Sequence, residues 1–203
     1  MVDNGLVHII DDDGAVRDSL VFLLRTARYE VRSYDSAVTF LADFKADGPG
    51  CIITDVRMPE VSGIELLHRL KERGIDLPVI VITGHGDIAL AVEAMKAGAV
   101  DFLEKPFDDE RVVAAIASAL DRSRMQAGRS AGRAQIAARL ATLSQRERQV
   151  LDALVAGAPN KSIAHDLGIS PRTVEVYRAN VMTKMEAGSL PELVRMVLAV
   201  SSD

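Results

Sequence analysis

Short apolar runs alternate with amphipathic stretches along the first 121 residues. The apolar runs have the length of buried strands, and they cover residues 6–10, 29–34, 51–54, 78–82 and 99–103. Between them, apolar residues recur three or four positions apart, as they do in amphipathic helices. This alternation predicts a doubly wound α/β domain built on a five-stranded parallel sheet.

Turn and capping residues stand where this alternation needs helices to begin and end. Ser36, Ser62 and Asp108 lie at expected helix starts, and Gly74 and Gly98 lie at expected helix ends. Short connections of this kind are typical of alternating strands and helices, so residues 1–121 are predicted to form one domain.

The pattern changes after residue 121. Residues 122–142 contain five arginines together with Gly128 and Gly132, and they show no strand signal. We interpret them as a linker that is helical in part. From residue 143 to residue 203 the apolar spacing is helical, and Ser144 with Glu147 forms the capping-box pattern of a helix start. Residues 143–203 are therefore predicted to form a small all-α domain.

Two helices of the second domain are separated by a tight turn. The first opens at Asn160 and ends near Gly168, and Ser170 with Pro171 marks the start of a longer second helix. A short helix, a tight turn and a longer helix make up the helix-turn-helix motif, whose second helix enters the major groove of DNA.

The outer face of the longer helix is predicted to read DNA. Glu175 suits a cytosine amino group, Val176 suits a thymine methyl group, and Arg172 suits guanine or a phosphate. The apolar residues left for the core are Val174, Tyr177, Val181 and Met185. The predicted DNA contacts are Lys161, Arg172, Thr173, Glu175, Val176, Arg178, Ala179, Asn180 and Lys184. The alternative is a solvated amphipathic helix in a protein-interaction module.

Charge divides the chain at the same place. Residues 1–121 carry 12 basic and 22 acidic side chains, a net charge of −10, whereas residues 122–203 carry 12 and 7, a net charge of +5. A basic helical half suits a polyanion such as DNA. Cys51 is the single cysteine of the sequence, so neither a disulfide framework nor a Cys-based metal site is available. Because no apolar run has the length of a signal peptide or a membrane span, we expect a cytoplasmic protein.

Four charged residues follow strands of the predicted sheet. Asp11 and Asp12 follow the first strand, Asp55 follows the third, and Lys105 follows the fifth. The carboxyl ends of parallel strands share one edge, so these side chains are expected to meet there. Three carboxylates together require cations, and Mg²⁺ with Lys105 balances their charge. A single acid in such a position more often caps a helix, but the full set predicts a magnesium and phosphoryl site.

Asp55 is the candidate phosphoryl acceptor of this site. One of its carboxylate oxygens can attack a phosphoryl group in line, while Lys105 neutralises charge on the transferred group. Thr83 ends the fourth strand, where its hydroxyl can reach a phosphate on Asp55. Phe102 lies near enough in sequence to Lys105 for its ring to fill the space that a moving Thr83 leaves.

As a set, these residues resemble the receiver domain of two-component response regulators. The resemblance implies a flavodoxin-like fold and a histidine kinase that transfers its phosphoryl group to Asp55. It implies that Mg²⁺ lies among Asp11, Asp12, Asp55 and the Arg57 carbonyl, and that Thr83 and Phe102 shift to remodel residues 87–121 into a dimer face. The matching motifs are Asp11-Asp12, Asp55 before Met58-Pro59, Thr83-Gly84, and Phe102 with Lys105-Pro106.

Residues 143–196 resemble the LuxR-type helix-turn-helix, and its pairing with a receiver is similar to the NarL/FixJ class of response regulators. The resemblance implies an activator that dimerises on phosphorylation, binds double-stranded DNA and works with RNA polymerase. It also implies an oxygen-sensing haem histidine kinase as partner and nitrogen-fixation or microaerobic respiration genes as targets. A regulator of the same class that controls unrelated genes is the alternative.

Other classes of protein fit the sequence less well. A haloacid-dehalogenase-like phosphatase also phosphorylates an aspartate, but it needs a second acid two residues later, where this chain has Arg57. A phosphate-relay or interaction module would not need the basic second half. An autoinducer-binding regulator would need a ligand pocket in place of the acidic site. We therefore expect a regulator that is not an enzyme.

Overall fold

The computed structural model describes residues 5–45, 48–84 and 88–201. Residues 1–4 and 202–203, at the outer ends of the two predicted domains, lie outside the described residues, as does residue 87 at the start of the predicted dimer face. The chain forms two compact units, Met1–Ala127 and Gly128–Asp203. The domain limits at residues 121 and 143 remain predictions.

The first unit contains a parallel five-stranded sheet with the order β2-β1-β3-β4-β5. Every residue of β1, β3 and β4 is buried, because these inner strands are covered on both faces. The two edge strands contain fewer apolar residues and are partly exposed. The strands are β1 (Leu6–Ile10), β2 (Glu30–Tyr34), β3 (Gly50–Asp55), β4 (Val79–Thr83) and β5 (Asp101–Glu104).

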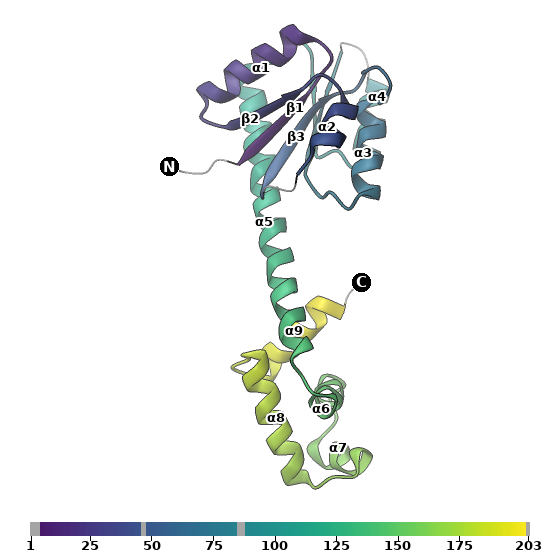
Figure 1. Cartoon of the computed structure of the whole chain (residues 1–203), viewed down its shortest axis with the longest axis vertical. Helices are drawn as coiled ribbons and strands as arrows, with labels where there is room; N and C mark the ends of the chain where they lie inside the picture. Colours follow the sequence, from purple (N-terminus) through teal and green to yellow (C-terminus); the bar gives the residue numbers. More distant parts are fainter. Residues whose placement is uncertain (1–4, 46–47, 85–87, 202–203) are drawn as a thin grey trace. The chain divides into compact units, whose positions relative to one another are not determined.

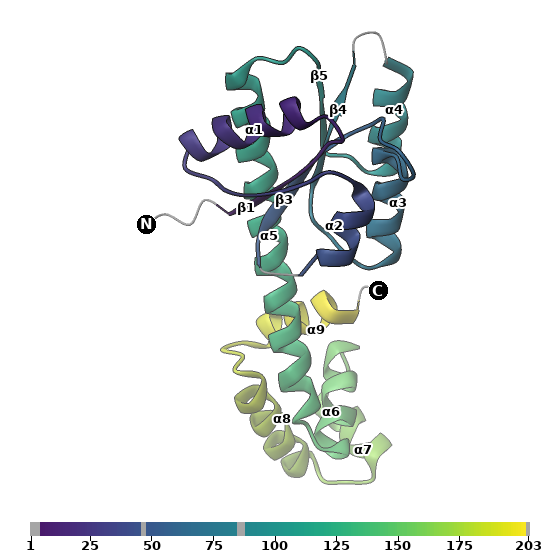
Figure 2. The ribbon, with the colours of Figure 1, turned by 45° about the horizontal axis from the view of Figure 1, so that its top comes forward.

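Helices cover both faces of this sheet, which confirms the doubly wound fold (Figures 1 and 2). One face packs against α1 (Gly14–Thr26) and α5 (Asp109–Ala141), with Leu20 and Ile116 in a shared core. The other face packs against three helices, with Phe40, Leu66 and Ala94 in a second core. These three helices are α2 (Ala37–Asp43), α3 (Gly63–Glu72) and α4 (Ile88–Ala97).

The predicted caps and turns hold these elements in place. The hydroxyls of Ser36 and Ser62 accept hydrogen bonds from the first turns of α2 and α3, and the Asp108 carboxylate accepts one from the Glu110 amide at the start of α5. Gly74 and Gly98 take φ angles of +65° and +115° after α3 and α4, a left-handed region that favours glycine.

Helix α5 continues through the predicted linker. It runs without a break for 33 residues, from Asp109 to Ala141, and therefore contributes to both compact units. Gly128 and Gly132 lie inside it, where their neighbours are mostly alanine, arginine and glutamine, which favour helix. The linker is thus helical up to residue 141.

The second unit is all-α, as the sequence predicts. Its core lies between the last turns of α5 and four further helices, with Leu151, Val181 and Leu193 in one cluster and Val150 and Val174 in another. Within the described ranges of the chain, no helix is long and apolar enough to cross a membrane. The four helices are α6 (Gln145–Val155), α7 (Asn160–Leu167), α8 (Pro171–Met185) and α9 (Leu190–Ser201).

A capping box and an ion pair fix the start of α6. The Ser144 hydroxyl accepts from the Glu147 amide, and the Glu147 carboxylate accepts from the Ser144 amide, as the sequence pattern predicts. The same carboxylate accepts a 2.7 Å hydrogen bond from Lys184 of α8. The Lys184 ammonium, followed by the Ser144 amide, lowers the pKa of Glu147.

We predict that Glu147→Gln destabilises the second unit by about 1 kcal/mol at pH 7, because it replaces a charge-assisted hydrogen bond with a neutral one. The pKa of Glu147 is lower in the folded than in the unfolded chain, so its contribution is complete above the ordinary pKa of glutamate and is lost as pH falls through the lowered one. Thermal unfolding of both proteins at pH 7 and in acid measures this. An equal difference in stability at both pH values would contradict it.

Candidate functional site

The carboxyl edge of the sheet brings together residues from three strands. Asp11 directly follows β1, Asp55 ends the neighbouring β3, and Lys105 directly follows β5. All strand pairs are parallel, so these three residues emerge at the same edge. The sequence analysis predicted this gathering.

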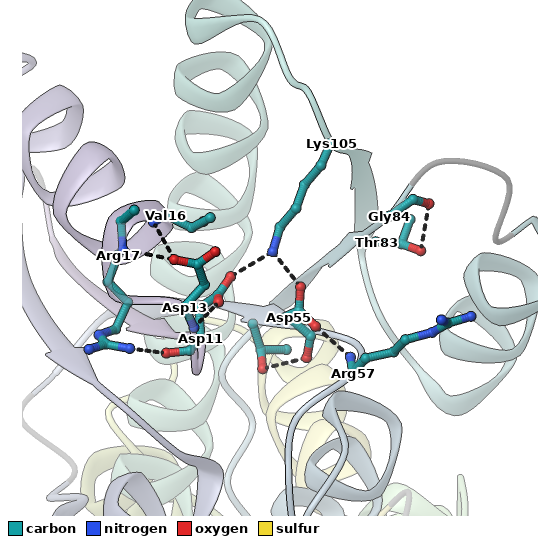
Figure 3. Close-up of polar contacts among 11 residues, drawn as sticks. Asp11, Asp13, Val16, Arg17, Asp55, Arg57, Thr83, Gly84 and Lys105 are labelled. Atoms are coloured by element: carbon teal, nitrogen blue, oxygen red, sulfur yellow. Dashed lines mark hydrogen bonds and ion pairs between the residues drawn. The ribbon is translucent and has the colours of Figure 1, made fainter.

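Lys105 links the two buried acids (Figure 3). Its Nζ atom lies 2.9 Å from Oδ2 of Asp11 and 2.6 Å from Oδ1 of Asp55, and it donates a hydrogen bond to each. One ammonium group therefore holds two carboxylates from adjacent strands. The backbone amide of Lys105 donates to the Thr83 carbonyl at 2.8 Å, which fixes the start of this side chain against β4.

Backbone groups orient the two carboxylates. The Asp13 amide donates to Oδ1 of Asp11 at 2.8 Å, and the Arg57 amide donates to Oδ2 of Asp55 at 2.5 Å. Arg17 of α1 donates to the carbonyl of Asp11, a contact that the sequence analysis did not foresee. Each carboxylate oxygen thus has one partner in these bonds and keeps a further lone pair.

Burial sets the electrostatics of the site. Asp11 is fully buried and Asp55 is 7% exposed. Desolvation raises the pKa of Asp11, against the opposing effects of Lys105 and of the Asp13 amide. Desolvation acts to lower the pKa of Lys105, but its hydrogen bonds to Asp55 and Asp11, together with the negative charge of these carboxylates, outweigh burial, and the net pKa is raised. The site therefore keeps Lys105 charged.

Asp12 and Arg57 lie beside this pair. The Asp12 side chain is exposed, and with Arg57, Met58 and Pro59 it lines a hollow next to the acids. Among the residues that the structure describes, no three carboxylate, histidine or cysteine side chains are already gathered as a metal site. Asp11, Asp12, Asp55 and the Arg57 carbonyl nevertheless offer oxygen ligands of the kind that Mg²⁺ prefers, so these residues fit that ion.

Thr83 and Phe102 occupy neighbouring strands at the same end of the sheet. Thr83 is buried, and its hydroxyl donates to the Gly84 carbonyl at 3.4 Å, whereas Phe102 is 42% exposed. Phe102 pairs with Val81 in the register of β4 and β5. Its ring lines an apolar hollow with Ala91, Val92, Met95 and Lys96. Thr83 thus contacts the acidic site, because its carbonyl accepts from the Lys105 amide, and Phe102 lies on the exposed face formed by α4 and β5.

Gly63 is a site residue that the sequence analysis missed. It opens α3, and a Cβ atom there would collide with the backbone carbonyl of Asp55. The Gly63 amide donates to the Val56 carbonyl at 3.1 Å. Only glycine allows this approach, which closes the segment after Asp55 against α3. Ser62 was recognised as a cap, but a steric need arising from a residue eight positions earlier has no local signal.

The predicted base-reading face of α8 is open. Arg172, Glu175, Ala179 and Asn180 are exposed, and Val176 is 57% exposed although it is apolar. Ser170 caps the helix, Pro171 is at its start, and Gly168 makes the turn before it with φ +65°. The structure confirms the predicted core face, because Val174, Val181 and Met185 are fully buried and Tyr177 is partly buried.

Several predicted DNA contacts already have partners within the protein. Arg178 donates to the Asn160 side chain of α7 at 3.2 Å, and Lys184 binds Glu147 of α6. Thr173 forms a 2.8 Å hydrogen bond with the Ser170 hydroxyl at the helix start. Lys161 is exposed on α7. Lys184 therefore has a structural role whether or not it also reaches a phosphate.

Two known protein families match separate parts of the chain. The family model for the response regulator receiver domain matches residues 7–117, and the model for bacterial regulatory proteins of the luxR family matches residues 141–197. The first match contains the acidic site, and the second contains α6 to α8 and most of α9.

Individual relatives resemble the chain over nearly its whole length. The transcriptional regulatory protein FixJ of Azorhizobium caulinodans is 61% identical over 95% of this chain and 91% of the relative. The crystal structure of full-length FixJ from B. japonicum is 54% identical over 97% of each chain, with a TM-score of 0.60. The structure of the response regulator StyR is 41% identical over 96% of this chain and 98% of its own, with a TM-score of 0.84.

These similarities establish a transcription factor and not an enzyme, in agreement with the argument from Arg57. The chain belongs to the FixJ-type response regulators of the NarL/FixJ family, in which a receiver domain is joined to a LuxR-type helix-turn-helix domain.

Proposed function

We propose that Asp55 accepts a phosphoryl group from a sensor histidine kinase. The bond between phosphorus and the kinase histidine nitrogen breaks as an Asp55 oxygen bonds to phosphorus. The observation that carries the proposal is the contact of Lys105 with both Asp11 and Asp55. An ammonium group at this position can neutralise the negative charge of a phosphoryl group that is transferred to Asp55. The geometry holds one Asp55 oxygen with the Arg57 amide and the other with Lys105.

The remaining residues of the site complete this reaction. Asp11, Asp12, Asp55 and the Arg57 carbonyl would hold Mg²⁺, which neutralises phosphoryl oxygens when bound. The Asp11 carboxylate is buried and is held in place by the Asp13 amide, whereas the Asp12 side chain lies on the exposed side of the site. The Thr83 hydroxyl exchanges its Gly84 contact for a phosphoryl oxygen.

Phosphorylation of Asp55 changes the positions of Thr83 and Phe102. Movement of Thr83 toward Asp55 makes room for the Phe102 ring, which withdraws from the exposed face of α4 and β5. That face is apolar around Ala91, Val92 and Met95, so a change there alters its fit to a second copy of the chain. A homodimer then presents two DNA-binding units to two half-sites, which raises their effective concentration on DNA.

On DNA, α8 enters the major groove with Arg172, Glu175, Val176 and Asn180 toward the base edges. The partner kinase is FixL-like, the regulator acts with RNA polymerase in the cytoplasm, and its targets are nitrogen-fixation or microaerobic genes. Support for this comes from the 61% identity with a FixJ protein over almost the full chain. Control of unrelated genes by the same mechanism is the alternative.

The switch is tested with the full chain and a phosphoryl mimic. We expect beryllofluoride with Mg²⁺ to convert the protein to a dimer in sedimentation and to tighten DNA binding at least tenfold, about 1.4 kcal/mol or more. Asp55→Asn should stay monomeric and bind weakly under both conditions. If the untreated protein or Asp55→Asn dimerises and binds as tightly as the treated wild type, the phosphorylation switch is wrong.

Removal of Lys105 should make the stability of the first unit depend on Mg²⁺. In Lys105→Met, the buried Asp11 and Asp55 carboxylates lose their shared cation. We expect the free energy of unfolding in EDTA to fall by about 2 kcal/mol, a moderate loss because Lys105 is partly exposed. Mg²⁺ should restore much of this loss. Thermal unfolding with EDTA and with Mg²⁺ measures it, and Lys71→Met on the exposed side of α3 is the control. A loss that Mg²⁺ does not reverse would count against a metal at these acids.

Two substitutions separate base reading from phosphate binding. Glu175→Ala should reduce the preference for one base pair by about 1–3 kcal/mol. Lys161→Ala should weaken binding to all sequences alike and lower by about one the slope of the logarithm of the binding constant against the logarithm of the salt concentration. The probes are duplexes selected from a random pool by the wild-type protein, with single base-pair changes. If Glu175→Ala weakens every duplex equally, Glu175 does not read a base.

A further inference from the structure

The carboxyl-terminal turn of α8 is held by residues from outside the helix-turn-helix. Arg139 in the last turn of α5 donates to the Met185 carbonyl at 3.1 Å and also forms an ion pair with Glu186. Lys184 donates to the Thr142 carbonyl at 3.4 Å in addition to Glu147. All of these residues belong to the second compact unit. The end of α5 and the start of α6 thus enclose the last turn of α8 from the side.

Arg139 suits the chemistry of this turn. The carbonyls at the end of a helix lack partners within it and carry partial negative charge, which a guanidinium can satisfy. Glu186 follows in the left-handed conformation at φ +53°, which is unfavourable for a residue with a Cβ. The fork of Arg139 reaches both the last helical carbonyl and the Glu186 carboxylate, so it fixes the place where α8 ends.

Apolar contacts beneath Arg139 reinforce this arrangement. Ile136 and Leu140 of α5 pack in the same cluster as Val181 and Met185 of α8. The base-reading residues Glu175 and Val176 are on the exposed face of the helix, away from this cluster. Helix α8 has 15 residues and is about 22 Å long, so a small change in direction at its last turn displaces its first turns.

We propose that Arg139 is a positioning residue for sequence-specific DNA recognition. It acts through the last turn of α8 and does not contact DNA. The inference rests on the proposed entry of α8 into the major groove. Hydrogen bonds to base edges require close placement of side chains, whereas contacts with phosphates tolerate small displacements. Loss of Arg139 should therefore weaken specific binding and leave non-specific binding unchanged.

The experiment uses the full chain with beryllofluoride and Mg²⁺. Its two probes are a duplex selected from a random pool by the wild-type protein and a scrambled duplex of the same composition. We expect Arg139→Met to bind the selected duplex about tenfold more weakly and the scrambled duplex as before, with an unchanged dependence on salt. Arg139→Lys, which keeps the charge but not the fork, should lose less. Arg129→Met, on an exposed part of the same helix, is the matched control and should behave as wild type.

A second variant protects the test against misfolding. Glu186 is exposed, with 68% of its side chain accessible, so Glu186→Gln removes the ion pair without disturbing the core. It should reduce the preference for the selected duplex in the same direction. The combination with Arg139→Met should bind no more weakly than Arg139→Met alone, because Arg139→Met already removes the ion pair that Glu186→Gln removes.

The outcomes separate this inference from the function on which it rests. If the wild type selects no preferred sequence, the proposed DNA reading fails. If selection succeeds but Glu186→Gln and a folded Arg139→Met both keep full preference, Arg139 does not position α8. If Arg139→Met weakens both duplexes equally and lowers the salt slope by about one, Arg139 binds a phosphate directly and the inference is wrong.

Discussion

The balance of charge at the carboxyl edge of the sheet is the constraint on which the first unit depends. Parallel pairing of β1 with β3 forces Asp11 and Asp55 to emerge side by side in a buried place. Two such carboxylates repel each other and lose hydration, which a folded protein tolerates only with a compensating cation. Lys105 supplies it from the other side of β4. Any group that adds charge to Asp55 therefore acts on a contact that also stabilises the fold.

Much of this site could be predicted because strand ends carry their own signal. An apolar run followed by an acid or a lysine predicts both the strand and the edge at which the side chain emerges, as at Asp11, Asp55 and Lys105. Local caps such as Ser62 and the Ser144 capping box were predicted for the same reason, since donor and acceptor lie within one turn.

The rest depended on contacts between residues far apart in the sequence. Gly63 is needed because α3 returns to the Asp55 carbonyl, and Arg139 finds Glu186 across 47 positions. Lys184 was predicted to contact DNA, but its hydrogen bond to Glu147 follows from the packing of α6 on α8. Residue type and spacing predict which side chains are charged and exposed, but not which distant group each one meets.

Helix α5 contributes residues to a core of each compact unit. Its first turns place Val112 and Ile116 in the core of the first unit, and its last turns place Ile136 and Leu140 in the core of the second. The stretch around Gly128 lies between the two and is mostly exposed, without core contacts to support it. Each glycine there costs about 1 kcal/mol of helix stability relative to alanine. Unwinding of α5 is therefore least costly between the cores, where it leaves both the Lys105 site and the support of α8 intact.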